Sequence, residues 1–170
     1  MADGGGGMAT RFQPDAANTR PLRDAFGRFA SGVTVVTASS ADGPVGITAN
    51  SFSSLSLDPP LVLWSPSVGS RRFPYFERAS HFAIHVLAAD QQDLCQRFAA
   101  SAFAFEAQEL AFNEHGVPVM RNCLARFECE TQAIYPGGDH KIVVGRVLDA
   151  EMRDGDALAF YAGRFQALEG

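Results

Sequence analysis

Short stretches of alternating apolar and polar side chains recur along the chain, and this period of two is typical of half-buried β-strands. The clearest stretch is 123–134, where charged and amide side chains fill one face and the other face holds Cys123, Ala125, Phe127, Cys129 and Ala133. Apolar or β-branched runs at 33–38, 45–52, 61–65, 81–88, 140–152 and 157–165 indicate further strands. The pattern therefore predicts six or seven strands, mostly antiparallel.

Turn residues stand between these strands. Asp42-Gly43-Pro44 predicts a hairpin that joins 33–38 to 45–52, and Pro136-Gly137-Gly138 separates 123–134 from 140–152. We expect Asp58-Pro59-Pro60 to prevent strand pairing locally and to lead into the strand at 61–65. Evenly spaced strands with turns between them favour a closed β-barrel over a parallel α/β sheet.

Helical spacing is confined to short segments. A helix that begins near Pro21 and ends at Ser31-Gly32 would carry Leu22, Ala25, Phe26, Phe29 and Ala30. Asp90 is expected to cap a second helix, which carries Leu94, Cys95, Phe98 and Ala99. A helical turn interrupted by Pro74 is expected after Ser70. Residues 100–122 are poorly patterned and predict a loop that turns Phe103, Phe105 and Phe112 inward.

Length, charge and composition set the broad class. The 170 residues fit one domain, which we expect at 19–170, and the Gly- and Ala-rich segment 1–18 is expected to be disordered. The net charge of −5 argues against binding to nucleic acid or to an anionic membrane. No signal peptide is recognised and no apolar run approaches the roughly 20 residues of a membrane span, so the cytoplasm is the expected compartment.

Metal and disulfide chemistry are not expected. Cys123 and Cys129 would lie about 20 Å apart on one strand and cannot pair with each other, so reduced cysteines are predicted. His81 and His85 would lie about 13 Å apart on a strand, too far to share a metal ion. The sequence also lacks the Rossmann, Walker, nucleophile-elbow and zinc-protease motifs. If the protein is an enzyme, a bound cofactor that carries the reaction would account for the lack of these motifs.

Residues 48–60, TANSFSSLSLDPP, place a dense row of hydroxyl and amide side chains directly before the apolar run LVLWS. Together with GVTVVTA (32–38), the segment GITANSFSSLSLDPPLVLWS (46–65) resembles the signature of the flavin reductase-like, FMN-binding split-barrel family. The resemblance continues in residues 67–72, 82–99, 137–147 (GGDHKIVVGRV) and 158–165 (LAFYAGRF). It covers essentially residues 20–168.

This resemblance implies a mainly β fold, a six- to seven-stranded antiparallel split β-barrel with a few short helices. It implies an NAD(P)H-dependent flavin reductase that transfers hydride to FMN or FAD, takes NADH or NADPH as reductant, and supplies reduced flavin to a partner monooxygenase. Family members are typically homodimers with flavin sites near the subunit interface. Two alternatives stay open. One is a flavin-binding carrier or electron-transfer module without efficient NAD(P)H oxidation. The other is an enzyme similar to pyridoxamine-phosphate oxidases. It is disfavoured because residues 65–72, the segment expected to bind phosphate, hold few cations.

The resemblance also implies the flavin-binding residues. Thr48, Ala49, Asn50 and Ser51 would line the polar edge of the flavin ring, although turn chemistry alone could explain short polar residues here. SPSVGSRR (65–72) would form a phosphate cradle from Ser65, Ser67, Ser70, Arg71 and Arg72. Which arginine contacts the phosphate stays open, and a solvated basic pair at a helix end is the competing interpretation.

His140 is the one candidate for a catalytic role. In GGDH (137–140) it would orient the nicotinamide or shape the electrostatics of hydride transfer, because this transfer needs alignment more than proton abstraction. Alternatively, Asp139 caps a tight turn and His140 begins the next strand. Phe165 would cover the flavin, reach a partner subunit or simply fill the core. Ala104 departs from the family, which often carries a cation there, and this puts the affinity or the choice of flavin in doubt.

Overall fold

The computed structural model describes residues 8–108 and 110–170. The segment 1–7, part of the stretch expected to be disordered, lies outside these residues. The described elements are α1 (Arg20–Phe26), β1 (Ser31–Gly32), β2 (Thr34–Ser40), β3 (Gly43–Ala49), β4 (Ser53–Leu57), β5 (Pro60–Trp64), α2 (Phe73–Arg78), β6 (His81–Val86), the 3-10 turn η1 (Ala89–Gln91), α3 (Gln92–Ala100), β7 (Ala111–Phe112), β8 (Pro118–Val119), β9 (Ala125–Gly137), β10 (His140–Met152), β11 (Ala157–Tyr161) and β12 (Arg164–Leu168).

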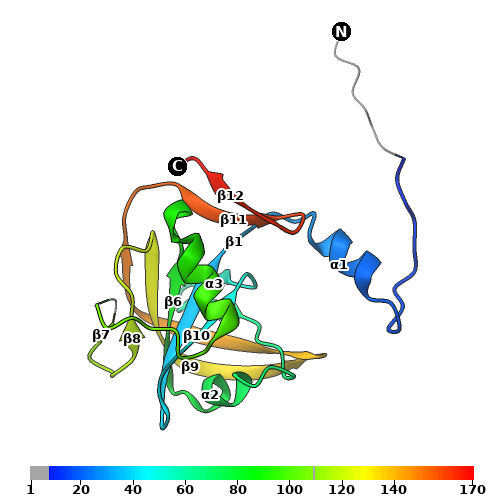
Figure 1. The fold of residues 1–170 in the computed structure, drawn as a ribbon. Coiled ribbons are helices and arrows are strands. Elements are labelled where there is room, and N and C mark those ends of the chain that lie inside the picture. Colours follow the sequence, from blue (N-terminus) through cyan, green and yellow to red (C-terminus); the bar gives the residue numbers. More distant parts are fainter. Residues whose placement is uncertain (1–7, 109) are drawn as a thin grey trace.

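A seven-stranded antiparallel sheet in the order β3-β2-β6-β9-β10-β5-β4 dominates the fold (Figure 1). Val45 on β3 and Trp64 on β5 stand near opposite ends of this order, yet both belong to one buried cluster. The sheet is therefore rolled around its core. The end strands β3 and β4 do not pair with each other within the described chain, so the barrel is split along this seam. The mainly β, seven-stranded antiparallel split barrel is as predicted.

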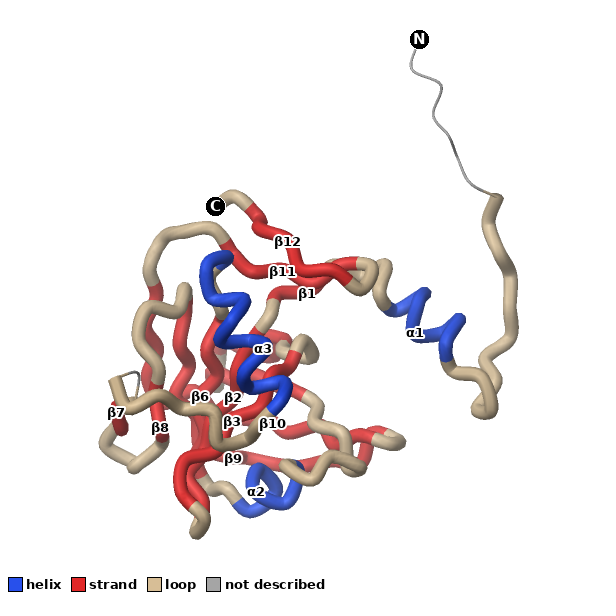
Figure 2. The backbone as a smooth tube through the Cα atoms, in the orientation of Figure 1, coloured by secondary structure: helices blue, strands red, loops and turns tan. Residues whose placement is uncertain are grey.

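Strand β2 is buried on both faces, which explains why its sequence is a continuous run rather than an alternation. Val36 points into the rolled sheet, where Trp64 packs edge-on against Phe76 of α2. Val35 points to the other face and belongs to a second cluster with Leu94, Cys95 and Phe98 of α3 and Leu158 of β11. Figure 2 shows α3 across this second face, with the small sheet β1-β11-β12 beyond it.

One strand was missed, because its sequence reads as a polar turn. Residues 53–57 form β4, an edge strand that pairs with β5, and Leu57 lies opposite Pro60. Asp58-Pro59-Pro60 therefore closes a hairpin instead of preventing pairing. Both prolines are tolerated here, because Pro59 lies in the turn and Pro60 is the first residue of β5, before the strand begins to pair with β10 at Leu61.

Two further expectations on turns and strands were wrong. The run 157–165 is not one strand but the hairpin β11–β12, in which Phe160 faces Phe165. Its turn residues Ala162 and Gly163 both have positive φ, as tight hairpin turns require, and a single glycine was too weak a signal. Pro74 does not interrupt a helix either, because it lies in the first turn of α2. A backbone N–H in the first turn has no partner within the helix, so its absence in proline costs nothing.

The helices at 20–26 and 92–100 form where expected, with differences at their ends. α1 is shorter than predicted and buries none of its own residues. Asp90 is not a cap, because it lies inside η1, whose N-cap residue is Ala88. The side-chain oxygen of Gln91 accepts the Ala88 N–H at 2.9 Å. In the excursion after α3, Phe105 packs inward against Phe98 as expected, whereas Phe103 and Phe112 are exposed.

The polar face of β9 is buried where the excursion β7–β8 covers it. Glu128 lies under this flap and accepts a hydrogen bond from Asn113 at 2.7 Å, and it pairs with Arg126 at 3.0 Å. Beside it, the fully buried His85 bridges β2 to the flap. Its Nε2 accepts the Met120 N–H at 3.0 Å, so the proton is on Nδ1, which donates to the Val35 carbonyl at 3.0 Å. The neutral imidazole is therefore a structural bridge.

Burial of His85, reinforced by the charge of Arg126, lowers its pKa from 6.5 to about 4. The unfolded chain takes up this proton first, so the His85 contribution is complete above pH 6.5 and is lost as pH falls toward 4. We expect His85→Gln to lower the free energy of unfolding by about 1–3 kcal/mol at pH 7. The gap between the two proteins should shrink toward pH 4, measured by urea unfolding at several pH values. A gap that stays constant over this range would contradict the assignment.

Candidate active site

The end of β3 and the first residues after it, 47–51, form one wall of a pocket of about 270 Å³ at the seam of the barrel. Most of the predicted site residues meet here: Thr48, Ala49, Asn50, Ser51, Ser65, Ser67, Ser70 and His140. The residues that sequence reasoning missed are the apolar Ile47, Trp64 and Pro66. Each of them comes directly before or after a predicted residue in the sequence, so closeness to the predicted residues could have identified them.

Several hydroxyls of this wall are already engaged within the protein. Ser51 accepts the Ser65 N–H at 2.9 Å and donates to the Ser65 carbonyl, which clasps the β3–β4 connection to the end of β5. Thr48 donates to the Cys95 carbonyl of α3 at 2.7 Å. These side chains therefore set the shape of the wall. The Asn50 side chain, in contrast, is exposed at the mouth of the pocket and has no hydrogen-bond partner among the described residues.

Close packing of α3 against β3 supports the same wall. A Cβ on Gly46 would stand 2.5 Å from the Phe98 ring, so only glycine allows this approach. The Gly46 N–H also donates to the Ala102 carbonyl at 2.8 Å, just beyond the end of α3. Ala104, where the family often has a cation, packs against the second core cluster, and its carbonyl accepts from Arg97.

His140 reaches the pocket because the β9–β10 turn docks on the segment that follows β5. The Val68 N–H donates to the Asp139 carbonyl and the Lys141 N–H donates to the Pro66 carbonyl, both at 3.0 Å. These bonds flank a bridge between Ser67 and His140. His140 is thus both the first residue of β10, as one interpretation of the sequence has it, and part of the pocket wall.

The imidazole of His140 is oriented by its neighbour. Its Nδ1 lies 2.8 Å from Oδ1 of Asp139, and this hydrogen bond, with the His140 charge, holds the pKa of the Asp139 carboxyl below its usual value. With Nδ1 engaged in this way, Nε2 is the nitrogen left for a ligand.

The two arginines of the expected phosphate cradle differ in their surroundings. Arg72 donates to the carbonyls of Phe98 and Ala99 at 2.6 and 2.8 Å, which fastens the end of α3 to the segment 65–72. Its backbone N–H donates to the Ser70 hydroxyl. Arg71 is exposed, and its side chain has no hydrogen-bond or ion-pair partner among the described residues. Neither arginine lines the pocket itself.

An apolar hollow of about 200 Å³ continues the pocket and shares Thr48, Ala49 and Asn50 with it. Phe165 lies here and meets Phe160 at a ring-centroid distance of 5.2 Å. The remaining lining residues, which sequence reasoning missed, are Val33, Cys95, Ala99 and Phe160. Cys95 and Ala99 are four residues apart on α3, and this helical spacing is the signal that could have placed them on one face.

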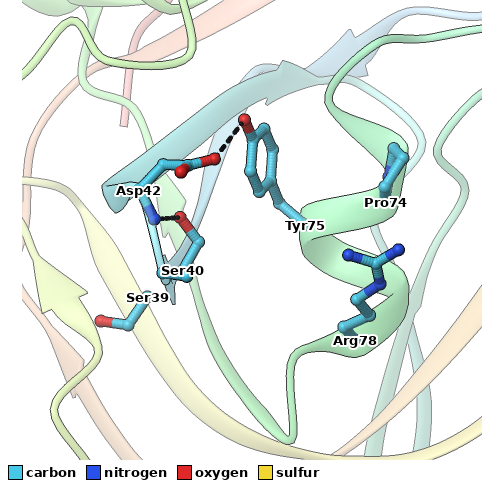
Figure 3. A pocket seen from close by; sticks show the side chains of 7 residues that line it. Ser39, Ser40, Asp42, Pro74, Tyr75 and Arg78 are labelled. Atoms are coloured by element: carbon cyan, nitrogen blue, oxygen red, sulfur yellow. Dashed lines mark hydrogen bonds between the residues drawn. The ribbon is translucent and has the colours of Figure 1, made fainter.

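Another hollow, of about 390 Å³, lies between the β2–β3 turn and α2 and contains none of the predicted residues (Figure 3). Two of its polar side chains are already paired with each other, because the Tyr75 hydroxyl donates to Asp42 at 3.0 Å. This bond raises the pKa of Tyr75. We therefore place the candidate site at the seam and not in this hollow.

Within residues 8–108 and 110–170, no group of three or more His, Cys, Asp or Glu side chains is arranged to hold a metal ion. All three cysteines are free thiols, and burial raises the pKa of Cys123 to about 11 and that of Cys129 to about 12. None of the described helices has the length and apolar character needed to span a membrane.

Comparison with known proteins gives the family of this chain. The family described as flavin reductase like domain matches residues 26–169. A protein named FMN reductase (NADH) SmoA, from Agrobacterium fabrum, is 54% identical over 91% of this chain and 88% of its own length. The reductase subunit HsaB of a flavin-dependent monooxygenase, from Rhodococcus jostii, is 36% identical over 91% of this chain and 80% of its own. The NADH:FAD oxidoreductase SgcE6 of Streptomyces globisporus, solved with NAD and FAD fragments, superposes with a TM-score of 0.84 at 35% identity, covering 92% and 96% of the two chains.

Proposed function

Because the chain belongs to the flavin reductase-like domain family, we propose that it reduces FMN or FAD with NADH or NADPH. The observation that supports this proposal best is the pocket at the seam. Its polar wall continues into an apolar hollow, and His140 borders it. A flavin ring has the same division, with a polar pyrimidine edge and an apolar dimethylbenzene end, so the residues present fit it. A flavin held here would supply N5 as the acceptor of a hydride from C4 of the reduced nicotinamide, with oxidised nicotinamide and reduced flavin as products.

The residues of the wall divide into those that bind and those that hold the wall in place. We assign contact with the polar edge of the ring to the Asn50 amide and to the backbone of 48–51. Thr48 and Ser51 keep this backbone in position through their bonds to Cys95 and Ser65. Ala99 and Phe165 cover the apolar end.

Phosphate binding falls to Ser67, Ser70 and Arg71. Arg72 is a positioning residue, because its guanidinium is committed to the carbonyls of α3. Arg71 stands next to Ser70 with no protein partner among the described residues, so its charge is available to an anion. His140 orients the nicotinamide, with Asp139 fixing its ring.

The recipient of the reduced flavin is a flavin-dependent monooxygenase. Relatives support this proposal, because one is named the reductase subunit of such an enzyme. The cytoplasm is the proposed compartment, since three free thiols suit a reducing environment.

The outer face of the main sheet supports a homodimer. Val144 pairs opposite Leu63 and Ala133, and Ile142 pairs opposite Tyr135, so all five side chains lie on the face opposite to that of the core residue Val143. Val144 is already buried in the single chain, at 8% exposure, whereas Tyr135 is exposed. The Arg146–Glu130 ion pair at 2.8 Å lies on the same sheet nearby. An apolar sheet face with a charged rim has the make-up of a subunit interface. A second copy of the chain is the proposed occupant.

The function is tested with purified protein, each flavin and each nicotinamide. We expect catalytic loss of absorbance at 340 nm, with many turnovers per protein chain, because both products leave the site after each transfer. A matched sample without flavin is the control. Tight flavin binding without nicotinamide oxidation would reject the reductase in favour of a carrier.

The arginine assignment is tested by flavin binding. Arg71→Ala should weaken FMN about 10- to 100-fold, the range of one hydrogen bond to a charged group, and leave riboflavin unchanged because riboflavin has no phosphate. Arg72→Ala should weaken both ligands alike and lower the melting temperature, since it frees the end of α3. Equal losses of FMN and riboflavin in Arg71→Ala would remove Arg71 from the phosphate site.

The dimer is tested by charge insertion on the outer face. Tyr135→Arg should shift the protein toward monomer in sedimentation velocity, because a buried charge opposes association. Phe112→Arg is a matched control, since Tyr135 is 56% exposed and Phe112, on the flap, is 55% exposed. Identical sedimentation of both variants and the wild type would argue against this interface.

A further inference from the structure

A wider cleft, of about 710 Å³, opens beside the flavin pocket and shares Asn50 and His140 with it. One wall is the body of the protein, with Asp139 and Phe160. The other wall is α1 and the residues after it, with Leu22, Arg23, Phe26 and Phe29. Figure 1 shows α1 standing at the side of the molecule, beyond β1 and β11. A ligand in this cleft would reach His140 directly.

The aromatic side chains on the α1 wall are left bare. Phe26 is 68% exposed and Phe29 is 81% exposed, and α1 buries no residue of its own. Exposed phenylalanine faces on the wall of a cleft can stack against a flat ring, and base–aromatic stacking is a common mode of nucleotide binding.

The α1 wall also carries a cation. Arg23 has no ion-pair or side-chain hydrogen-bond partner among the described residues. It lies close enough to Asp139 to help lower the pKa of that carboxyl. Asp139 is the acidic side chain of the cleft, and its carboxylate is already bonded to His140. Arg23 therefore offers a bidentate donor to an anion held between α1 and His140.

We propose that this cleft takes the ADP arm of a dinucleotide, with Arg23 on the pyrophosphate and with Phe26 and Phe29 against the adenine. The inference rests on the proposed function, because NADH and FAD both carry such an arm. Both dinucleotides would place it beside the flavin ring, and the cleft opens there. Arg23 is a binding residue that sets affinity for the whole dinucleotide and does not take part in hydride transfer.

The test compares Arg23→Ala with Arg28→Ala, a cation of the same segment that does not line the cleft. With FMN as acceptor, Michaelis constants are measured for NADH and for 1-benzyl-1,4-dihydronicotinamide, a reductant without phosphate or adenine. Dissociation constants for FMN and FAD are measured by flavin fluorescence. Wild-type turnover with NADH is the reference, and its absence would refute the proposed function rather than this inference.

If the cleft holds the arm of NADH, Arg23→Ala raises the Michaelis constant for NADH about tenfold or more and leaves the benzyl compound unchanged. If it holds the arm of FAD, the variant weakens FAD about tenfold or more relative to FMN. Arg28→Ala should change neither. Retention of both wild-type preferences in Arg23→Ala would overturn the inference, as would equal losses for the long and the short ligands.

The aromatic wall is tested separately by Phe26→Ala and Phe29→Ala. Each should raise the same constant that Arg23→Ala raises, without a change in sedimentation. A shift in oligomeric state with unchanged dinucleotide affinity would show that this face of α1 contacts a second copy of the chain. That result would overturn the assignment of the aromatic wall to adenine.

Discussion

The backbone bonds between the segment after β5 and the β9–β10 turn hold the candidate site together. Two hydrogen bonds, from Val68 to Asp139 and from Lys141 to Pro66, join parts of the chain that are about seventy positions apart in the sequence. Without them, His140 would stand at the tip of a long free hairpin. With them, it faces the end of β3, where the polar wall begins. The site is therefore a product of one docking contact at the open seam of a rolled sheet.

The seam itself explains why the polar row lies beside a buried strand. Strand β5 pairs with β10 on one side, and the Ser-rich segment pairs with its other side as the edge strand β4. Residues 48–51, which are the end of β3 and the start of its connection to β4, line the pocket. Their hydroxyls are spent largely on holding this turn and α3 in place. Short polar residues here serve the scaffold first, and the surface that remains for a ligand is mostly amide and backbone.

Much of this arrangement follows from the sequence, and the failures have physical causes. The strands at 34–40, 43–49, 60–64, 81–86 and 140–152 are encoded by strong local patterns. The hairpin at Ala162-Gly163 and the edge strand β4 give weak signals, because a turn needs only two permissive residues and because serine, which fills most of β4, is also a common turn residue. Arg72 could not be separated from Arg71 by sequence, since the distinction depends on where α3 ends in space. The cleft along α1 depends in the same way on where α1 lies relative to the rest of the protein, and no local sequence pattern specifies this.

Asn50 has a position with its own consequence, because it borders all three hollows around the seam. Phe165 borders only the apolar hollow and Arg23 only the wide cleft. Redesign of coenzyme preference is therefore best begun at the latter two positions, where one compartment can be altered in isolation. A change at the shared amide would retune every compartment at once.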